Sequence, residues 1–170
     1  RFDVDGKRLL SASRDFTARI WSLEDSEAAP LVFRKHTGSV NDAAFLPLQE
    51  KIITGSDDGK AIIWDIANQK PVLTMEHNRP ILKVEINSAS TRVLTWADDA
   101  TAILWDTVQG KNLATLKSSG AEVLVVHFSP DGKQVVGGRS NGTIITWSAE
   151  DGTEMTVLAS GTEDPLSGHS

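Results

Sequence analysis

The four tryptophans Trp21, Trp64, Trp105 and Trp147 recur along this chain at intervals of 43, 41 and 42 residues. A period of just over forty residues is typical of proteins built from repeated structural units. The same residue types stand at the same distances before each tryptophan. The sequence therefore predicts four units in one register, and a function has to be sought among the side chains that the repeat itself does not use.

The units share residue types at four offsets from the tryptophan. Six residues before it stand Asp15, Asp58, Asp99 and Asn141. Ten residues before it stand Ser11, Thr54, Thr95 and Gly137. Nineteen residues before it stand the apolar Phe2, Phe45, Ile86 and Phe128. Twenty-eight residues before it stand His36, His77 and Ser119, and the first unit begins too late to have this position.

Short apolar segments within each unit predict β-strands. The runs 61–64, 102–105 and 144–147, each ending at a tryptophan, suit strands that are buried on both faces. Another strand in each unit is expected to end at the apolar residue that stands nineteen before the tryptophan. With a valine or isoleucine five residues earlier, these strands would span 40–45, 81–86 and 123–128.

Turn-forming residues separate the predicted strands. Ser129–Gly132 reads Ser-Pro-Asp-Gly, in which proline pre-sets one backbone dihedral and glycine tolerates a positive φ. Asp58–Gly59 and Asn141–Gly142 are signals for tight hairpins. No segment shows a convincing helical period. Each unit is therefore predicted to be a four-stranded antiparallel sheet, and the chain to be all-β.

These repeats resemble those of the WD-repeat family of β-propellers. Two units carry the dipeptide that names the family and two have serine in place of its aspartate: Trp64–Asp65, Trp105–Asp106, Trp21–Ser22 and Trp147–Ser148. His36 and His77 match the histidine that begins each repeat of this family, although Lys35 and Glu76 replace the glycine that usually precedes it.

The resemblance implies a β-propeller with four consecutive four-stranded blades, the first truncated at its N-terminal side. The expected blades are about 1–34, 35–75, 76–116 and 117–160, followed by a loop and the start of a fifth repeat at 161–170. Propellers close into rings of typically four to eight blades, and this family usually has about seven. We therefore expect a segment of a longer protein whose remaining blades complete the ring. A half-ring that pairs with a second copy is the alternative.

The resemblance also assigns a structural role to the recurring polar residues. In WD-repeat blades an indole N–H, a hydroxyl, an imidazole and a carboxylate form a hydrogen-bond tetrad. The matching sets are His36, Thr54, Asp58 and Trp64; His77, Thr95, Asp99 and Trp105; and Ser11, Asp15 and Trp21. The same residue types could form a hydrolytic triad. Because buried polar groups need partners, and because one copy would suffice for catalysis, we expect scaffolding and no catalytic residue.

Two departures from the repeat invite a functional interpretation. The fourth unit has lost most of its tetrad, since it has Ser119, Gly137 and Asn141. One explanation is sequence drift in a blade that its neighbours hold in place, and the other is a softer blade that adapts to a partner. Trp96 stands where the other units have a small residue. It is expected to fill space against the adjoining blade, or else to be an aromatic anchor on the rim of the propeller.

Composition narrows the functional classes. The formal net charge is −6, and acidic and basic residues are mixed along the chain. The sequence contains no basic block of the kind that binds a phosphate backbone, so we expect no nucleic-acid partner. No run approaches the roughly twenty apolar residues of a membrane span. There is no cysteine, no metal-ligand spacing and no phosphate loop, so we expect no metal or cofactor. A cytoplasmic location is a weak expectation.

The preferred prediction is a non-enzymatic scaffold that binds proteins or peptides through loops on one rim, where the tetrad geometry places the histidine loops and the aspartate hairpins. It could be the sensor or regulatory module of a larger protein. The rim candidates for partner binding are Arg14, Lys35, Lys60, Arg79, Trp96, Asp98 and Arg139.

An enzymatic or ligand-binding propeller, with a site at the mouth of the central channel, is the alternative function. It would need unpaired carboxylates or histidines on the innermost strands. The candidate positions for such a site are Asn41, Asp42, Lys83 and Glu85.

Overall fold

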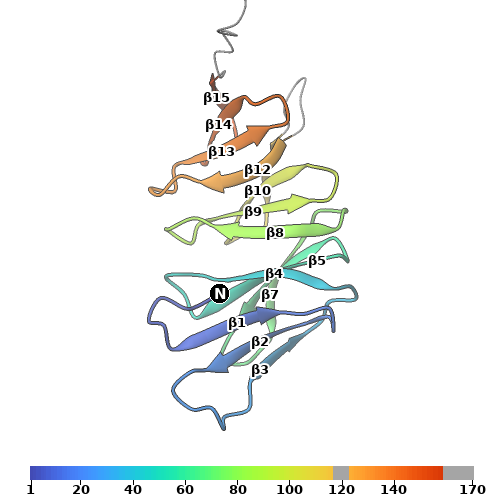
Figure 1. The fold of residues 1–170 in the computed structure, drawn as a ribbon, viewed down its shortest axis with the longest axis vertical. Coiled ribbons are helices and arrows are strands. Elements are labelled where there is room, and N and C mark those ends of the chain that lie inside the picture. The colour runs from blue at the N-terminus through green and yellow to red at the C-terminus, as the bar shows by residue number, and fades with distance from the viewer. Residues whose placement is uncertain (117–122, 159–170) are drawn as a thin grey trace, which may run out of the picture.

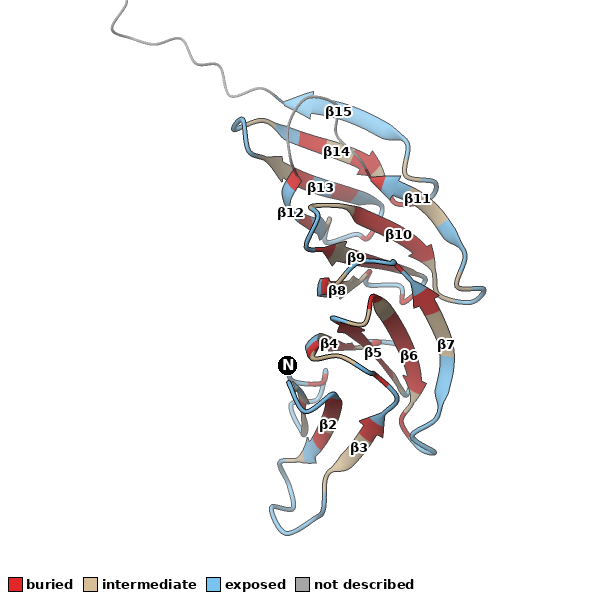
Figure 2. Ribbon diagram, turned by 90° about the vertical axis from the view of Figure 1, so that its right-hand side faces the viewer, coloured by how far each residue is buried: buried red, intermediate tan, exposed pale blue. Residues whose placement is uncertain are grey.

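The computed structural model describes residues 1–116 and 123–158, which form four antiparallel β-sheets. The sheets follow one another in chain order along the long axis and stack in a curved row (Figure 1, Figure 2). Within each sheet, strands that are consecutive in sequence are also neighbours in space. The all-β, blade-by-blade architecture that the repeats predicted is confirmed. Ser119 and residues 161–170, the expected start of a fifth repeat, lie outside the described residues.

We call the sheets blades one to four. Blade one contains β1 (Arg8–Ala12), β2 (Thr17–Ser22) and β3 (Leu31–Arg34), with a bridge from Phe2 to Leu9 beside β1. Blade two contains β4 (Val40–Phe45), β5 (Lys51–Ser56), β6 (Lys60–Asp65) and β7 (Pro71–Glu76). Blade three contains β8 (Ile81–Ile86), β9 (Arg92–Ala97), β10 (Ala102–Asp106) and β11 (Asn112–Leu116). Blade four contains β12 (Val123–Phe128), β13 (Gln134–Arg139), β14 (Ile144–Ser148) and β15 (Glu154–Leu158).

The first strand of each four-stranded blade begins and ends at the residues predicted from the repeat. The predicted burial on both faces is also found for 61–64 in β6 and 102–105 in β10. It is wrong for 144–147 in β14, where Ile144 is exposed. The reason is positional: β6 and β10 lie between two neighbouring sheets, whereas the described part of the chain places no sheet beyond blade four.

The hairpin that leads into the tryptophan-bearing strand turns in the same way in all four blades. In blade one this hairpin lies between β1 and β2, and in the other blades it lies between the second and third strands. The residue five before the tryptophan has a positive φ in each: Phe16, Gly59, Ala100 and Gly142. Glycine adopts this conformation without a steric penalty, and this is the basis of the predicted turns at Asp58–Gly59 and Asn141–Gly142. Blades one and three adopt the same turn without a glycine, so the fold imposes it there.

Three apolar cores join the four blades. Each core combines one face of a blade with the opposite face of the next blade, so neighbouring residues of one strand belong to different cores. In β5, for example, Ile52 packs with Phe33 of blade one, whereas Ile53 packs with Val84 of blade three. Trp64, Trp105 and Trp147 belong to the cores that face the preceding blade. The stacking of blades therefore depends on the residues that define the sequence repeat.

The outer faces of the first and last blades are partly exposed to solvent. Trp21 of blade one is 38 % exposed, whereas Trp64 at the same position of blade two is 1 % exposed. On the far face of blade four, Val136, Ile144 and Leu158 are exposed large apolar side chains. Figure 2 shows the contrast between the buried centres of the middle blades and the exposed outer strand β15. Both faces have the character of blade interfaces.

Adjacent glycines in β13 allow a matched test of the packing around Trp147. A Cβ atom at Gly137 would lie 2.7 Å from the Trp147 ring, within the core between blades three and four. We expect Gly137→Ala to lower the free energy of unfolding by about 1–3 kcal/mol, because overpacking a core forces its side chains out of their preferred positions. Denaturant unfolding followed by tryptophan fluorescence measures this change.

Gly138→Ala is the control, because its Cβ would meet the side chain of Val125 on the exposed face, which can rotate away. We expect it to change stability by less than about 0.5 kcal/mol. Equal losses for the two variants would contradict the assignment of Gly137 to the blade interface.

Candidate functional site: the histidine rim

Blade two contains a continuous chain of hydrogen bonds from Trp64 to Asp58. The Trp64 indole Nε1 donates to Thr54 Oγ1 at 2.9 Å, and Thr54 Oγ1 lies 2.7 Å from His36 Nε2. His36 Nδ1 lies 2.9 Å from Asp58 Oδ2. Both the His36 ring and the Asp58 carboxylate are almost fully buried. The chain connects β6, β5, the loop that precedes β4 and the β5–β6 hairpin within one blade.

A neutral His36 satisfies every atom of this chain. Its Nδ1–H donates to Asp58, and its Nε2 accepts the hydroxyl proton of Thr54, which in turn accepts from Trp64. Burial lowers the pKa of His36 below its ordinary value of 6.5, and this effect outweighs the attraction of the Asp58 charge. Burial by itself would raise the pKa of Asp58. The hydrogen bonds from Thr37 N–H, His36 and Lys60 N–H outweigh it, so the pKa of Asp58 lies below its ordinary value of 3.8.

Blade three contains a hydrogen-bond chain with one more member than the sequence predicted. Trp105 Nε1 donates to Thr95 Oγ1 at 2.8 Å, and Thr95 Oγ1 lies 2.7 Å from His77 Nδ1. The other ring nitrogen of His77 lies 2.9 Å from Thr101 Oγ1, which donates to Asp99 Oδ1 at 2.6 Å. The expected direct bond between His77 and Asp99 is therefore wrong, because the Thr101 hydroxyl stands between them.

The residue four before the tryptophan decides which form a blade adopts. Where it is a threonine, its hydroxyl donates to the aspartate or asparagine two residues earlier: Thr17 to Asp15, Thr101 to Asp99 and Thr143 to Asn141. Blade two has Lys60 at this position, so the side chain of Asp58 is free to meet His36. Sequence reasoning missed this residue, although the threonine at this offset in three of the four units was a visible signal.

Blades one and four contain only parts of the chain among the described residues. In blade one, Trp21 Nε1 donates to Ser11 Oγ at 2.9 Å, while Asp15 binds Thr17 and Arg19. In blade four, Gly137 takes the place of the hydroxyl residue, and the Trp147 ring packs directly against it. The loss of the hydroxyl thus makes room for tighter apolar packing, a consequence of the substitution that the sequence alone did not show.

These chains lie beneath one end of the blades, which we call the histidine rim. It comprises the loops 35–39 and 77–80 and the hairpins 13–16, 57–59, 98–101 and 140–143. Backbone hydrogen bonds connect its loops to its hairpins, as from His77 N–H to the Gly59 carbonyl and from Asp57 N–H to the Ser39 carbonyl. The loops are therefore held in place from below by the chains and from the side by the hairpins.

The predicted rim residues fall into three groups in the structure. Arg79 pairs with Asp98 at 3.3 Å and approaches Asp99, and Lys60 lies 3.7 Å from Glu76, so their charges are largely compensated. Arg14 and Lys35 are exposed, and within the described residues neither forms an ion pair. Arg139 is half-buried, and its Nε has no hydrogen-bond partner in that part of the chain.

Trp96 lies between blades and not on the exposed rim. Its half-buried side chain packs against the core shared by blades three and four, and its Nε1 is buried without a partner among the described residues. This position does not fit the alternative prediction that Trp96 is an aromatic anchor for a partner on the rim. The space-filling interpretation fits it, because the equivalent space above Gly55 is filled by Ile81 and Val84 of the next blade.

Carboxylates along the first strands of the blades are already paired. Asp42 accepts from the Arg1 guanidinium at 2.7 Å and from Val84 N–H at 3.1 Å. Glu85 lies 2.9 Å from His127 Nδ1 and accepts from Phe128 N–H. No cluster of three or more metal-binding side chains occurs in residues 1–116 and 123–158. This arrangement gives no support to a reactive site at the channel mouth.

Comparison with known proteins places the chain in a family. The family model described as "Nucleolar protein 10-like, N-terminal domain" matches residues 12–157, and the model described as "WD domain, G-beta repeat" matches residues 1–22. The chain belongs to the Nucleolar protein 10-like family of WD-repeat β-propellers. The resemblance inferred from the tryptophan register is therefore confirmed.

Several named proteins are similar to parts or most of this WD-repeat chain. Apoptotic protease-activating factor 1 of Rattus norvegicus is 25 % identical over 94 % of the chain. U3 snoRNP-associated protein-like YAOH of Oryza sativa subsp. japonica is 34 % identical over 48 % of it, and WD repeat-containing protein 37 of Homo sapiens is 39 % identical over 46 %. The matches cover only 13 to 16 % of the length of these relatives. The described residues contain no helix that is long and apolar enough to span a membrane.

Two neighbouring aspartates provide a matched test of the blade-two chain. We expect Asp58→Ala to lower the free energy of unfolding by about 1–3 kcal/mol, because it leaves His36 Nδ1 and two backbone N–H groups without an acceptor. Asp57→Ala is the control, since Asp57 is exposed and the only hydrogen bond of its carboxylate in the described structure comes from the Asn41 side chain. Thermal and urea unfolding compare the two, and the role of the chain is refuted if Asp58→Ala unfolds like the parent protein.

The buried histidines also predict how stability depends on pH. Burial lowers the pKa of both His36 and His77 below 6.5 in the folded state, so the unfolded chain binds protons first as pH falls. Their contribution to stability is fully present above pH 6.5 and is lost below it. We expect the urea midpoint to fall between pH 7.5 and pH 5.5, and the fall to be smaller in a His36→Gln/His77→Gln variant. An identical pH dependence in both proteins would contradict the folded-state protonation inferred for these rings.

Proposed function

We propose that this chain is part of a non-enzymatic scaffold that binds a protein or peptide partner through the histidine rim. The observation that carries the proposal is the set of hydrogen-bond chains below that rim. In blade two, His36 binds both Thr54 and Asp58, and all three side chains are buried; in blade three, Thr95 binds His77, and both are buried. The side chains that resemble a catalytic apparatus are thus engaged in holding strands together, and the loops above them remain to recognise a partner.

Positive charge without an ion-pair partner in the described residues marks one place on this rim as the candidate for partner docking. Arg14 lies in the hairpin of blade one and Lys35 in the loop that leads from blade one to blade two. The hairpin carrying Arg14 is joined to blade two by a hydrogen bond from Val40 N–H to the Ser13 carbonyl. Both cations are exposed and lack an ion-pair partner among the described residues, unlike Arg79 and Lys60. We infer that an acidic segment of the partner docks across this boundary.

The cellular setting is proposed from the family and from one relative. The matching family is named for a nucleolar protein, and the rice relative is named as associated with the U3 snoRNP. A role within a multi-protein assembly of that kind would suit a scaffold. The earlier expectations of a cytoplasmic location and of no nucleic-acid contact remain predictions. So does the expectation that further blades of the parent protein cover the exposed faces of blades one and four.

Charge reversal on the two rims tests the proposal. In the full-length protein, Arg14→Glu combined with Lys35→Glu should lower the recovery of bound partner proteins about tenfold or more, measured by quantitative mass spectrometry after affinity purification. The control is Lys70→Glu combined with Lys133→Glu, which changes the same charge at exposed positions of the opposite rim. Equal recovery with both double variants would refute docking at the histidine rim.

A further inference from the structure

Blade one carries a connection that the other blades lack. Residues 23–30 join β2 to β3, whereas the corresponding connections are 66–70, 107–111 and 149–153. The longer connection lies on the rim opposite the histidine rim, because β2 corresponds to the third strand of the four-stranded blades. It has its own internal structure: Ser22 Oγ accepts from Asp25 N–H, and Asp25 Oδ1 accepts from Glu27 N–H.

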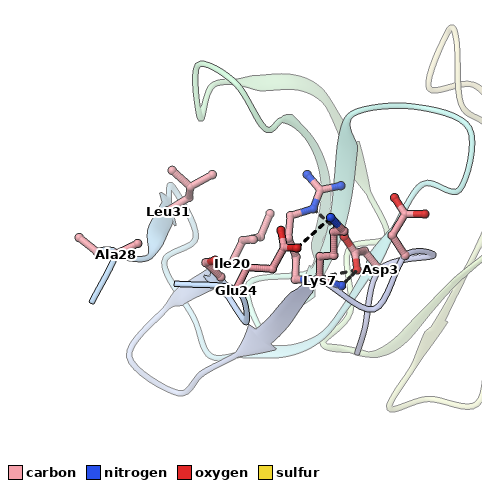
Figure 3. A pocket seen from close by; sticks show the side chains of 10 residues that line it. Asp3, Lys7, Ile20, Glu24, Ala28 and Leu31 are labelled. Carbon is pink, nitrogen blue, oxygen red and sulfur yellow. Dashed lines mark hydrogen bonds and ion pairs between the residues drawn. The ribbon is translucent and has the colours of Figure 1, made fainter. Parts of the chain in front are cut away.

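The longer connection forms one side of an open pocket of about 490 Å³ on blade one. Ile20, Ala28 and Leu31 provide an apolar surface, while Asp3, Lys7 and Glu24 provide polar side chains. In Figure 3, Ala28 and Leu31 lie on one side of the pocket, and Lys7 and Asp3 lie on the other. Ile20 and Leu31 pair across β2 and β3 and share the face of blade one that is turned towards blade two.

The pocket continues into a second hollow between blades one and two. That hollow measures about 260 Å³ and shares Asp3, Asp5 and Arg8 with the first. Two of the apolar side chains that line it, Val4 and Leu48, are 84 % and 72 % exposed. The two hollows together offer room for an extended segment with apolar side chains, and exposed apolar groups beside a concave surface are typical of binding sites.

The charges around the two hollows are predominantly negative. The segments 3–8 and 23–30 contain the five acids Asp3, Asp5, Glu24, Asp25 and Glu27 and the two bases Lys7 and Arg8. Both bases are already engaged: Arg8 binds Asp3 at 2.7 Å and Glu50 at 2.8 Å, and Lys7 binds Glu24 at 2.8 Å. Asp5 on the pocket wall forms no ion pair within the described residues. An incoming cation would therefore meet carboxylates, such as that of Asp5, that pair with no base in the described part of the chain.

We propose that these two hollows are a second docking site, which binds an extended segment of a partner protein carrying basic residues next to apolar ones. The apolar side chains enter the space lined by Ile20, Ala28 and Leu31, and a basic side chain binds Asp5. The Asp3–Arg8–Glu50 network holds the wall between the hollows rigid and joins blade one to blade two. This site differs from the histidine rim in position and in the sign of its charge, so the two docking sites take partner segments of opposite charge.

A short synthetic peptide tests the site in the full-length protein. The probe is a fluorescent, end-blocked tetrapeptide of alternating leucine and arginine, and binding is measured by fluorescence anisotropy. We expect saturable binding that weakens about tenfold or more in Asp5→Lys, which reverses the wall charge, and in Ala29→Trp, which fills the pocket. The matched controls are Glu150→Lys on the same rim of blade four and Ala67→Trp in the shorter connection of blade two. Both should bind within about twofold of the parent protein.

The outcomes separate this proposal from the proposed function. A peptide with glutamate in place of arginine should not bind, and Arg14→Glu with Lys35→Glu should leave binding of the basic peptide unchanged. The docking site is refuted if the basic peptide fails to bind saturably. It is also refuted if Ala29→Trp binds like Ala67→Trp, or if the glutamate peptide binds equally well. None of these results depends on whether the histidine rim binds a partner.

Discussion

In blades two and three, the tryptophan near the end of the third strand holds the structure together in two directions at once. Its indole N–H donates to a hydroxyl within its own blade, as Trp64 does to Thr54. Its ring packs against the preceding blade, where Trp64 meets Phe33 edge to face with ring centroids 5.6 Å apart. One side chain thus stabilises both the sheet and the stacking of sheets. Both contacts need a fixed ring orientation. The hydrogen-bond chain that starts at the indole therefore holds the histidine loop above it in a fixed position.

The need to keep the tryptophan buried and its polar neighbours hydrogen-bonded explains why the blades tolerate different polar residues around it. In blade two a carboxylate binds the histidine directly, in blade three Thr101 stands between them, and in blade four a glycine lets the Trp147 ring move into the space of the hydroxyl. Every version keeps the tryptophan buried, at 1 to 4 % exposure in blades two to four. The requirement is a satisfied buried interface, and several sets of residues meet it.

We propose that partner binding takes place on the two rims, which differ in charge. On the histidine rim, Arg14 and Lys35 have no ion-pair partner among residues 1–116 and 123–158, and the opposite rim of blade one presents an acidic pocket beside its longer connection. Between them the blade interiors are filled by apolar side chains and paired polar groups. A scaffold built in this way can hold two partners of opposite charge at a separation that the rigid blade sets.

The sequence by itself determined the four blades of this chain, the bounds of the first strand in three of them, and the histidine and hydroxyl residues that the tryptophans join in blades two and three. A repeat in register states each of these facts more than once. It could not determine features that occur once. The position of Thr101 between His77 and Asp99, the burial of Trp96 between blades and the exposure of Ile144 each depend on which side chain approaches from another strand or blade. Likewise, the repeat says nothing about the eight residues after β2, and the pocket beside them exists only because they lie next to side chains of β1 and β3. Periodicity specifies local structure, whereas a site arises where segments distant in sequence meet.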